Sequence, residues 1–171
     1  MNRLVLEDRV LFCHAECGLQ ARWPAAIGRN GLTSAKREGD GATPVGDFPI
    51  RRLFYRPDRV TFKTSCYRTV AIQPDMGWCD DAKAGAIYNR QVALPCSFRH
   101  ERLWRMDHCY DLLLEIGYND DPPVAGLGSA IFLHCAAEDF RPTEGCIAIA
   151  RAHFLTMITM EAPLRRLVIC P

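Results

Sequence analysis

Apolar residues occur in short segments along most of this chain, and clusters rich in Gly, Pro, Asn and Asp separate one segment from the next. Such a pattern is typical of pleated strands joined by tight turns. The turn clusters cover residues 28–31, 38–46, 119–128 and 141–145. We therefore predict strands over residues 9–13, 19–27, 48–54, 69–72, 111–118, 129–135 and 165–170.

Helical spacing is clear in one segment, residues 150–160. Phe154, Met157 and Ile158 lie at helical intervals there, and Pro163 follows. A second helix is predicted over residues 75–85. The 171 residues have the length of one ordinary globular domain. We predict a single domain over residues 1–171, mainly β, folded as a β-sandwich or barrel-like structure with one or two short helices.

Charge and cysteine content exclude several classes of protein. Lys and Arg number 21 against 20 Asp and Glu, which argues against a nucleic-acid binder that works through bulk charge. The longest charge-free stretch, residues 122–137, opens with two prolines and contains two glycines, so no membrane-spanning helix is expected. Only three apolar residues lie between Arg3 and Glu7, so no secretory signal is visible. The nine cysteines are irregularly spaced and do not resemble a secreted disulfide framework.

A histidine and a cysteine are the strongest candidates for chemistry. The apolar segment 129–135 carries His134, and a loop of eleven residues leads from there to Cys146, directly after Gly145. An imidazole beside a thiol can remove its proton and stabilise the thiolate, which is the basis of cysteine nucleophiles. Gly145 lets the backbone approach a substrate closely, so the amides around it can face a developing oxyanion.

These residues resemble the signature of the YkuD family of L,D-transpeptidases. That signature is a strand-borne His followed by a loop carrying Ser/Thr-His-Gly-Cys, and here it reads Phe132-Leu133-His134 and residues 143–146, Thr-Glu-Gly-Cys. Residues 36–50 are similar to the Gly-Asp-Gly-x-Thr-Pro-x-Gly-x-Phe turn of the same family. The resemblance spans residues 28–149 and implies a YkuD-like β-sandwich. Further segments resemble a compact subgroup: residues 77–81, 88–90 and 118–120.

Two positions depart from the family pattern. Glu144 stands where most members have a second His, and Ala148 stands where most have Arg two residues after the Cys. The usual cationic contacts near the nucleophile are therefore missing. We expect the binding mode of the donor peptide, and with it the preferred cross-link, to differ from those of most members.

The resemblance implies an acyltransferase without a cofactor. The Cys146 thiolate attacks a stem-peptide carbonyl and forms a thioester, while His134 acts as general acid and base. Peptidoglycan stem peptides are then both donor and acceptor, joined by a 3→3 or a 1→3 linkage. One alternative is a cysteine hydrolase of the same fold, an L,D-carboxypeptidase or an amidase-like enzyme. Another is a non-catalytic wall-binding module, which the retained nucleophile and base disfavour.

Further residues are candidates at the site. Gly145 and Thr143 are expected in the oxyanion loop, where Thr143 makes a local turn bond or touches substrate. Glu144 can bind an acceptor ammonium, orient His134 or remain solvated, and Arg141 suits a substrate carboxylate. The remaining substrate-binding candidates are Cys135, which adds a second thiol near His134, and Tyr118 and Asn119.

A metal site is not predicted. Cys13, His14 and Cys17 lie close together in sequence, but structural zinc needs four converging ligands and no second pair is present. Trp23, Trp78 and Trp104 can line a groove but suit the core equally well. We expect a monomer in the periplasm or cell envelope, because the implied substrate lies there, although no signal peptide is visible.

Overall fold

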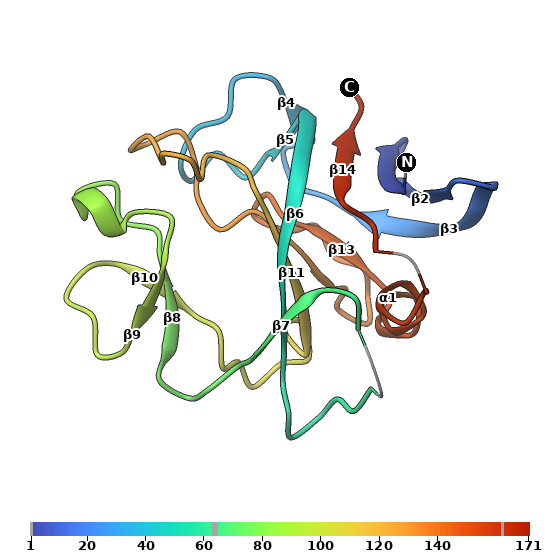
Figure 1. Cartoon of the computed structure of the whole chain (residues 1–171). Helices are drawn as coiled ribbons and strands as arrows, with labels where there is room; N and C mark the ends of the chain where they lie inside the picture. The colour runs from blue at the N-terminus through green and yellow to red at the C-terminus, as the bar shows by residue number, and fades with distance from the viewer. Residues whose placement is uncertain (1, 63–64, 162) are drawn as a thin grey trace.

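The computed structural model describes residues 2–62, 65–161 and 163–171, and it is mainly β (Figure 1). The large sheet has nine strands in the order β11-β12-β13-β3-β2-β1-β14-β6-β7. Its strands are β1 (Arg3–Glu7), β2 (Val10–Ala15), β3 (Gly18–Ala26), β6 (Gly46–Tyr55), β7 (Arg68–Ala71), β11 (Leu112–Ile116), β12 (Phe132–Cys135), β13 (Ile147–Ile149) and β14 (Arg166–Ile169).

Strand β6 closes the large sheet on itself. Its first residues pair with β14, and its later residues pair with β11, the strand at the other end of the order. The result is a barrel-like sandwich, as the sequence predicted. All seven predicted strands lie over strands of this sheet. Strands β1 and β13 were not predicted.

Alternation along the central strands divides the core into two clusters. In β11, Leu112 and Leu114 pack in the larger cluster, whereas Leu113 belongs to the smaller one with Phe54 and Trp78. Successive side chains of a strand point to opposite faces, so β11 can be buried along its whole length. Strand β12 follows the same rule, with Phe132 in the smaller cluster and Leu133 and Cys135 in the larger one.

One α-helix, α1 (Arg151–Ile158), covers the larger cluster. Its buried residues are the three apolar residues on which the helix was predicted, Phe154, Met157 and Ile158. Across the described ranges, no helix is long and apolar enough to cross a membrane.

The second predicted helix, over residues 75–85, is wrong. Strand β8 (Met76–Cys79) lies in the first half of that segment, and a 3-10 turn, η1 (Gly85–Ile87), begins at its end. Strand β8 pairs with β9 (Gln91–Ala93) and β10 (His100–Arg102) in a three-stranded sheet, seen at the left of Figure 1. Buried pairing with distant strands therefore determines the conformation of a short segment with little helical preference of its own.

A third, two-stranded sheet completes the fold. It joins β4 (Leu32–Thr33) to β5 (Thr43–Pro44) in parallel, and the turn cluster of residues 34–42 lies between these two strands.

Candidate active site

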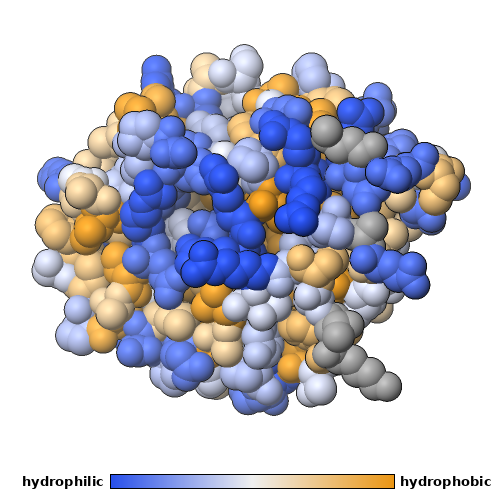
Figure 2. All heavy atoms as spheres, viewed as in Figure 1, coloured by the Kyte–Doolittle hydropathy of each residue, from blue (hydrophilic) through white to orange (hydrophobic). Residues whose placement is uncertain are grey.

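A cavity of about 710 Å³ opens beside β12 and β13. Its walls come from the loop after β4, from β10, from the segment before β12 and from residues 137–144. His134 and Cys146 both line it. Figure 2 shows hydrophilic residues gathered in the middle of one face of the molecule, with apolar residues among them.

Strand pairing brings the two candidate catalytic residues to one face. Strands β12 and β13 run parallel, with His134 opposite Ala148. Cys146 directly precedes β13, and its Sγ accepts a hydrogen bond from the Phe132 amide at 3.4 Å. Because alternate residues share a face, His134 and Cys146 project to the same side of the sheet, two register positions apart.

Cys146 rests as a neutral thiol. Its Sγ donates to the Ala130 carbonyl at 3.1 Å, a contact that only the protonated form can make. Burial raises the pKa of the thiol to about 12, and the Glu101 carboxylate acts in the same direction. A standing thiolate is therefore disfavoured in the empty site.

His134 rests as a neutral imidazole. It is 8% exposed, and burial lowers the pKa of its ring to about 4. Its Nδ1 lies 2.9 Å from the Cys135 carbonyl, an acceptor, so Nδ1 carries the proton and Nε2 keeps a free lone pair. The ring of Tyr110 packs edge-on against the imidazole, with 5.3 Å between the ring centroids. This arrangement holds one tautomer in place, ready to accept a proton at Nε2.

The loop before Cys146 is fixed by its own hydrogen bonds. Thr143 Oγ1 donates to the Cys146 carbonyl at 2.6 Å and accepts from the Gly145 amide at 3.1 Å. Thr143 therefore makes the local turn bond that was one of its two expected roles. The Gly145 amide is already used in this contact, which leaves the Cys146 amide as the expected oxyanion donor of the pair.

Gly145 occupies a position that other residues cannot take easily. Its φ is +138°, and a Cβ there would lie 2.9 Å from the carbonyl oxygen of Ala42. The same Cβ position lies 3.6 Å from Nζ of Lys36. A buried ammonium therefore stands against the loop that carries the candidate nucleophile, and sequence reasoning gave Lys36 no role.

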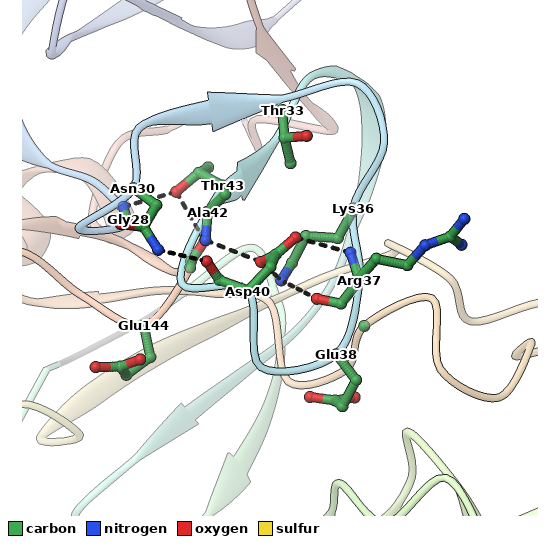
Figure 3. A network of polar contacts seen from close by, with 12 residues as sticks. Gly28, Asn30, Thr33, Lys36, Arg37, Glu38, Asp40, Ala42, Thr43 and Glu144 are labelled. Carbon is green, nitrogen blue, oxygen red and sulfur yellow. Dashed lines mark hydrogen bonds and ion pairs between the residues drawn. The ribbon is translucent and has the colours of Figure 1, made fainter.

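Asp40 organises the turn that carries Lys36 (Figure 3). Lys36 Nζ donates to Asp40 Oδ1 at 2.5 Å, and the amides of Arg37 and Ala42 donate to the same carboxylate at 2.7 and 2.9 Å. Thr43, at the end of the turn, joins it to the loop before the nucleophile by donating to the Gly145 carbonyl at 2.8 Å. The Gly-Asp-Gly turn thus holds the loop before Cys146 in place through Thr43.

Glu144 and Arg141 reach the cavity in different ways. Glu144 forms an ion pair with Arg29, and 79% of its side chain is exposed. Arg141 lines this cavity and also a neighbouring one of about 910 Å³ on the other side of residues 137–141. Arg29 was not predicted, and its distance in sequence from Glu144 gave no signal for the pair.

Three predicted substrate-binding residues lie away from the cavity. Cys135 follows His134 in β12, so it points to the opposite face, where its thiol contacts the Leu112 carbonyl in the core. Tyr118 donates its hydroxyl to the Leu127 carbonyl. Asn119 binds the backbone of Val124 and Gly128 with its side-chain amide. Each of these side chains bonds to the backbone or packs in the core.

Sequence reasoning missed a polar group beside His134. Tyr110, which packs on the imidazole, donates its hydroxyl to Glu101 at 2.6 Å, and Arg105 contacts the same carboxylate at 3.2 Å. All three residues line the cavity. No motif in the sequence identifies Tyr110 or Arg105.

The other residues considered from the sequence serve packing. Trp78 is buried against Phe132, Trp104 lies under the Arg56 guanidinium at 3.7 Å, and Trp23 stacks on His153. Within the described part of the chain, no group of three or more His, Cys, Asp or Glu is arranged to hold a metal ion.

Comparison with known protein families agrees with the fold. The model of the YkuD family, the L,D-transpeptidase catalytic domain, matches residues 4–162. The chain therefore belongs to the YkuD family of L,D-transpeptidase catalytic domains. None of the curated proteins matches it. Lys36 supplies a cation near the nucleophile although Glu144 and Ala148 replace the residues usual at those two positions.

Proposed function

We propose that this protein is an L,D-transpeptidase that cross-links peptidoglycan stem peptides through a thioester on Cys146. One observation carries the proposal: a neutral imidazole with a free Nε2, on β12, and a neutral thiol, directly before the parallel strand β13, line the same cavity. This is the resting state that general-base activation of a thiol requires.

The first half-reaction forms the acyl-enzyme. Nε2 of His134 takes the Cys146 proton as sulfur attacks the donor carbonyl, and negative charge develops on the carbonyl oxygen near the Cys146 amide. The tetrahedral adduct collapses, the C–N bond breaks, and the leaving amine takes the proton from His134. Because neither charged form is favoured at rest, proton transfer accompanies attack rather than preceding it.

The second half-reaction transfers the acyl group. An acceptor amine attacks the thioester carbonyl and gives a proton to His134, which returns it to the departing sulfur. The product contains a new amide bond, and the enzyme regains its thiol. Water attacking in place of the amine turns the same chemistry into hydrolysis.

Substrate and fold suggest the setting. We propose a single catalytic domain over residues 1–171 that works as a monomer in the cell envelope, where peptidoglycan lies. The linkage is 3→3 or 1→3, since Glu144 and Ala148 remove the contacts usual in the family.

Incubation with disaccharide-tetrapeptide fragments tests this proposal. The wild type should form dimers with loss of a terminal residue, and Cys146→Ala should form none, as measured by mass spectrometry. Fragmentation of the dimer identifies the linkage. Trimmed monomers alone would assign the hydrolase instead, and unchanged fragments would contradict both activities on this donor.

A further inference from the structure

The carboxylates of the cavity differ in whether a cation neutralises them. Asp80 pairs with Arg99 at 3.0 Å, and Glu144 pairs with Arg29. Glu101, on β10, is paired less closely with its cation, because Arg105 lies 3.2 Å from it. The guanidinium of Arg105 binds Asp107 more closely, with two contacts of 2.9 and 2.6 Å.

Arg105 is therefore shared between two carboxylates. One positive charge set against the two negative charges of Glu101 and Asp107 leaves this group with a net negative charge. Asp107 takes the bidentate contact, which is the stronger form of the interaction. The remaining negative charge thus lies on the Glu101 side of the group, which lines the cavity.

Glu101 also presents an uncommitted oxygen. Tyr110 and Arg105 both donate to its Oε1, and within the residues that the structure describes no hydrogen bond reaches Oε2. The side chain is 27% exposed, and it lines the cavity. Burial raises the pKa of this carboxyl, so its charged form, with one free oxygen, is best satisfied by a cationic donor.

The position of Glu101 connects it to both candidate catalytic residues. Tyr110 holds Glu101 with its hydroxyl and packs its ring on His134. The negative charge of Glu101 also opposes ionisation of Cys146, since it raises the pKa of that thiol after the larger effect of burial. Glu101 and Cys146 line the same cavity, so a ligand that neutralises Glu101 there removes a charge that opposes the thiolate.

The fourth carboxylate of the cavity, Glu38, forms no ion pair within the described residues, and its hydrogen bonds are of another kind. Its Oε2 accepts hydrogen bonds from the hydroxyls of Tyr88 and Ser129 at 2.5 and 2.7 Å. Glu38 thus joins the Lys36–Asp40 turn to the segment before β12. Its role as a structural acceptor distinguishes it from Glu101.

We propose that Glu101 binds the ammonium group of the substrate's diamino acid, and that the bound ammonium promotes ionisation of Cys146. This inference rests on the proposed function for the identity of the substrate. The ammonium donates to Oε2 of Glu101 and cancels the charge that opposes the thiolate. Substrate recognition and activation of the nucleophile are then one event.

The experiment compares two tetrapeptide stems that differ at one nitrogen. One carries the free amine of its diamino acid, and the other carries the same nitrogen acetylated. Binding of each is measured by calorimetry to Cys146→Ala, in which no turnover occurs. Cys146→Ala should bind the stem with the free amine about tenfold or more tightly than the acetylated stem, as expected for a charge-assisted hydrogen bond. Glu101→Gln should remove this preference, since the amide has no charge.

Glu38→Gln is the matched control, because it removes one negative charge from the same cavity while its amide oxygen can still accept from Tyr88 and Ser129. This variant should keep the preference. Loss of the preference in Glu38→Gln but not in Glu101→Gln would overturn the proposal. Equal binding of the two stems to Cys146→Ala with Glu101 and Glu38 intact would also overturn the proposal, whatever the result with the two Gln variants.

A second measurement follows the nucleophile itself. Cys146 is alkylated with iodoacetamide, and its peptide is quantified by mass spectrometry. Both stems are shortened by the terminal residue that the donor loses, so that no thioester blocks Cys146. The free-amine stem binds beside the thiol and can also shield it, so the acetylated stem is the reference. Alkylation should be several-fold faster with the free-amine stem than with the acetylated one, and equal with both in Glu101→Gln. Equal rates with both stems in the wild type would contradict the effect on ionisation.

The two proposals fail in different ways. Cross-linking by the wild type together with a preference that Glu101→Gln leaves intact would refute the role of Glu101 alone. A preference that depends on Glu101, without any product from the wild type, would refute the proposed function and leave the ammonium site standing.

Discussion

Thr43 and Gly145 lie 102 positions apart, and the hydroxyl of Thr43 donates to the carbonyl of Gly145 at 2.8 Å. The same hydroxyl oxygen accepts from the Gly28 amide at 2.8 Å, and Thr43 is completely buried. One side chain thus joins Gly28, between β3 and β4, to the loop of the candidate nucleophile. The shape of the active site depends on this contact.

Replacing Thr43 with valine should therefore destabilise the protein. Valine has the same shape but leaves the Gly28 amide and the Gly145 carbonyl without their partner, at an expected total of about 3 kcal/mol. The free energy of unfolding in urea measures this loss. Thr33→Val is the control, because Thr33 accepts only from the Ala35 amide near the surface, and it should cost less than about 1 kcal/mol. Equal losses in both variants would show that the buried contact is unimportant.

Gly145→Ala should impair the site through a steric contact. The new Cβ would lie 2.9 Å from the Ala42 carbonyl, in a backbone conformation that alanine rarely adopts. We expect a loss of about 2 kcal/mol or more in unfolding free energy and a loss of cross-linking. Gly126→Ala separates the two causes, because Gly126 has φ +82° but nothing within 4 Å of its Cβ position. It should show the smaller loss of a strained backbone alone.

Alkylation of Cys146 should rise steadily with pH. With a thiol pKa of about 12, the thiolate fraction increases roughly tenfold for each pH unit below that value. The rate of iodoacetamide reaction at Cys146, followed by mass spectrometry of its peptide, should therefore show no plateau between about pH 5 and pH 9. A plateau beginning near neutral pH would instead indicate a standing thiolate–imidazolium pair.

His134 should make the fold sensitive to acid. The pKa of its imidazole is about 4 in the folded protein against an ordinary value of 6.5, so the unfolded chain binds more protons between these values. Stability from this group is complete above about pH 6.5 and is lost as the pH falls toward 4, by up to about 3 kcal/mol. Urea unfolding at several pH values measures this loss. His134→Gln should remove this part of the pH dependence, and an unchanged slope would contradict the assigned shift.

The sequence predicted the parts of the fold that local patterns control. Alternating segments identified seven strands of the large sheet, and Phe154, Met157 and Ile158 identified α1. Strand β13 (Ile147–Ile149) was missed because its three residues are all buried and show no alternation. Strand β8 was assigned to a helix because only its pairing with β9 and β10 makes it extended.

The candidate site was predictable only where a motif marked it. Spacing and family resemblance identified His134 and Cys146, and the structure places both on one cavity. Tyr110 and Glu101 reach the same cavity from other elements, so no local signal in the sequence could group them with His134. Cys135 was separable in principle, because neighbours in a strand face opposite sides of the sheet.

The closed pairing of the large sheet determines where this protein can move. Strand β12 has a hydrogen-bonded neighbour on each side, β11 and β13, so opening it requires two ladders to break. Its amides should be among the slowest to exchange with deuterium, whereas those of residues 137–141 should exchange early. We therefore expect the opening motion that admits a peptide to come from residues 137–141, while His134 stays on a rigid strand.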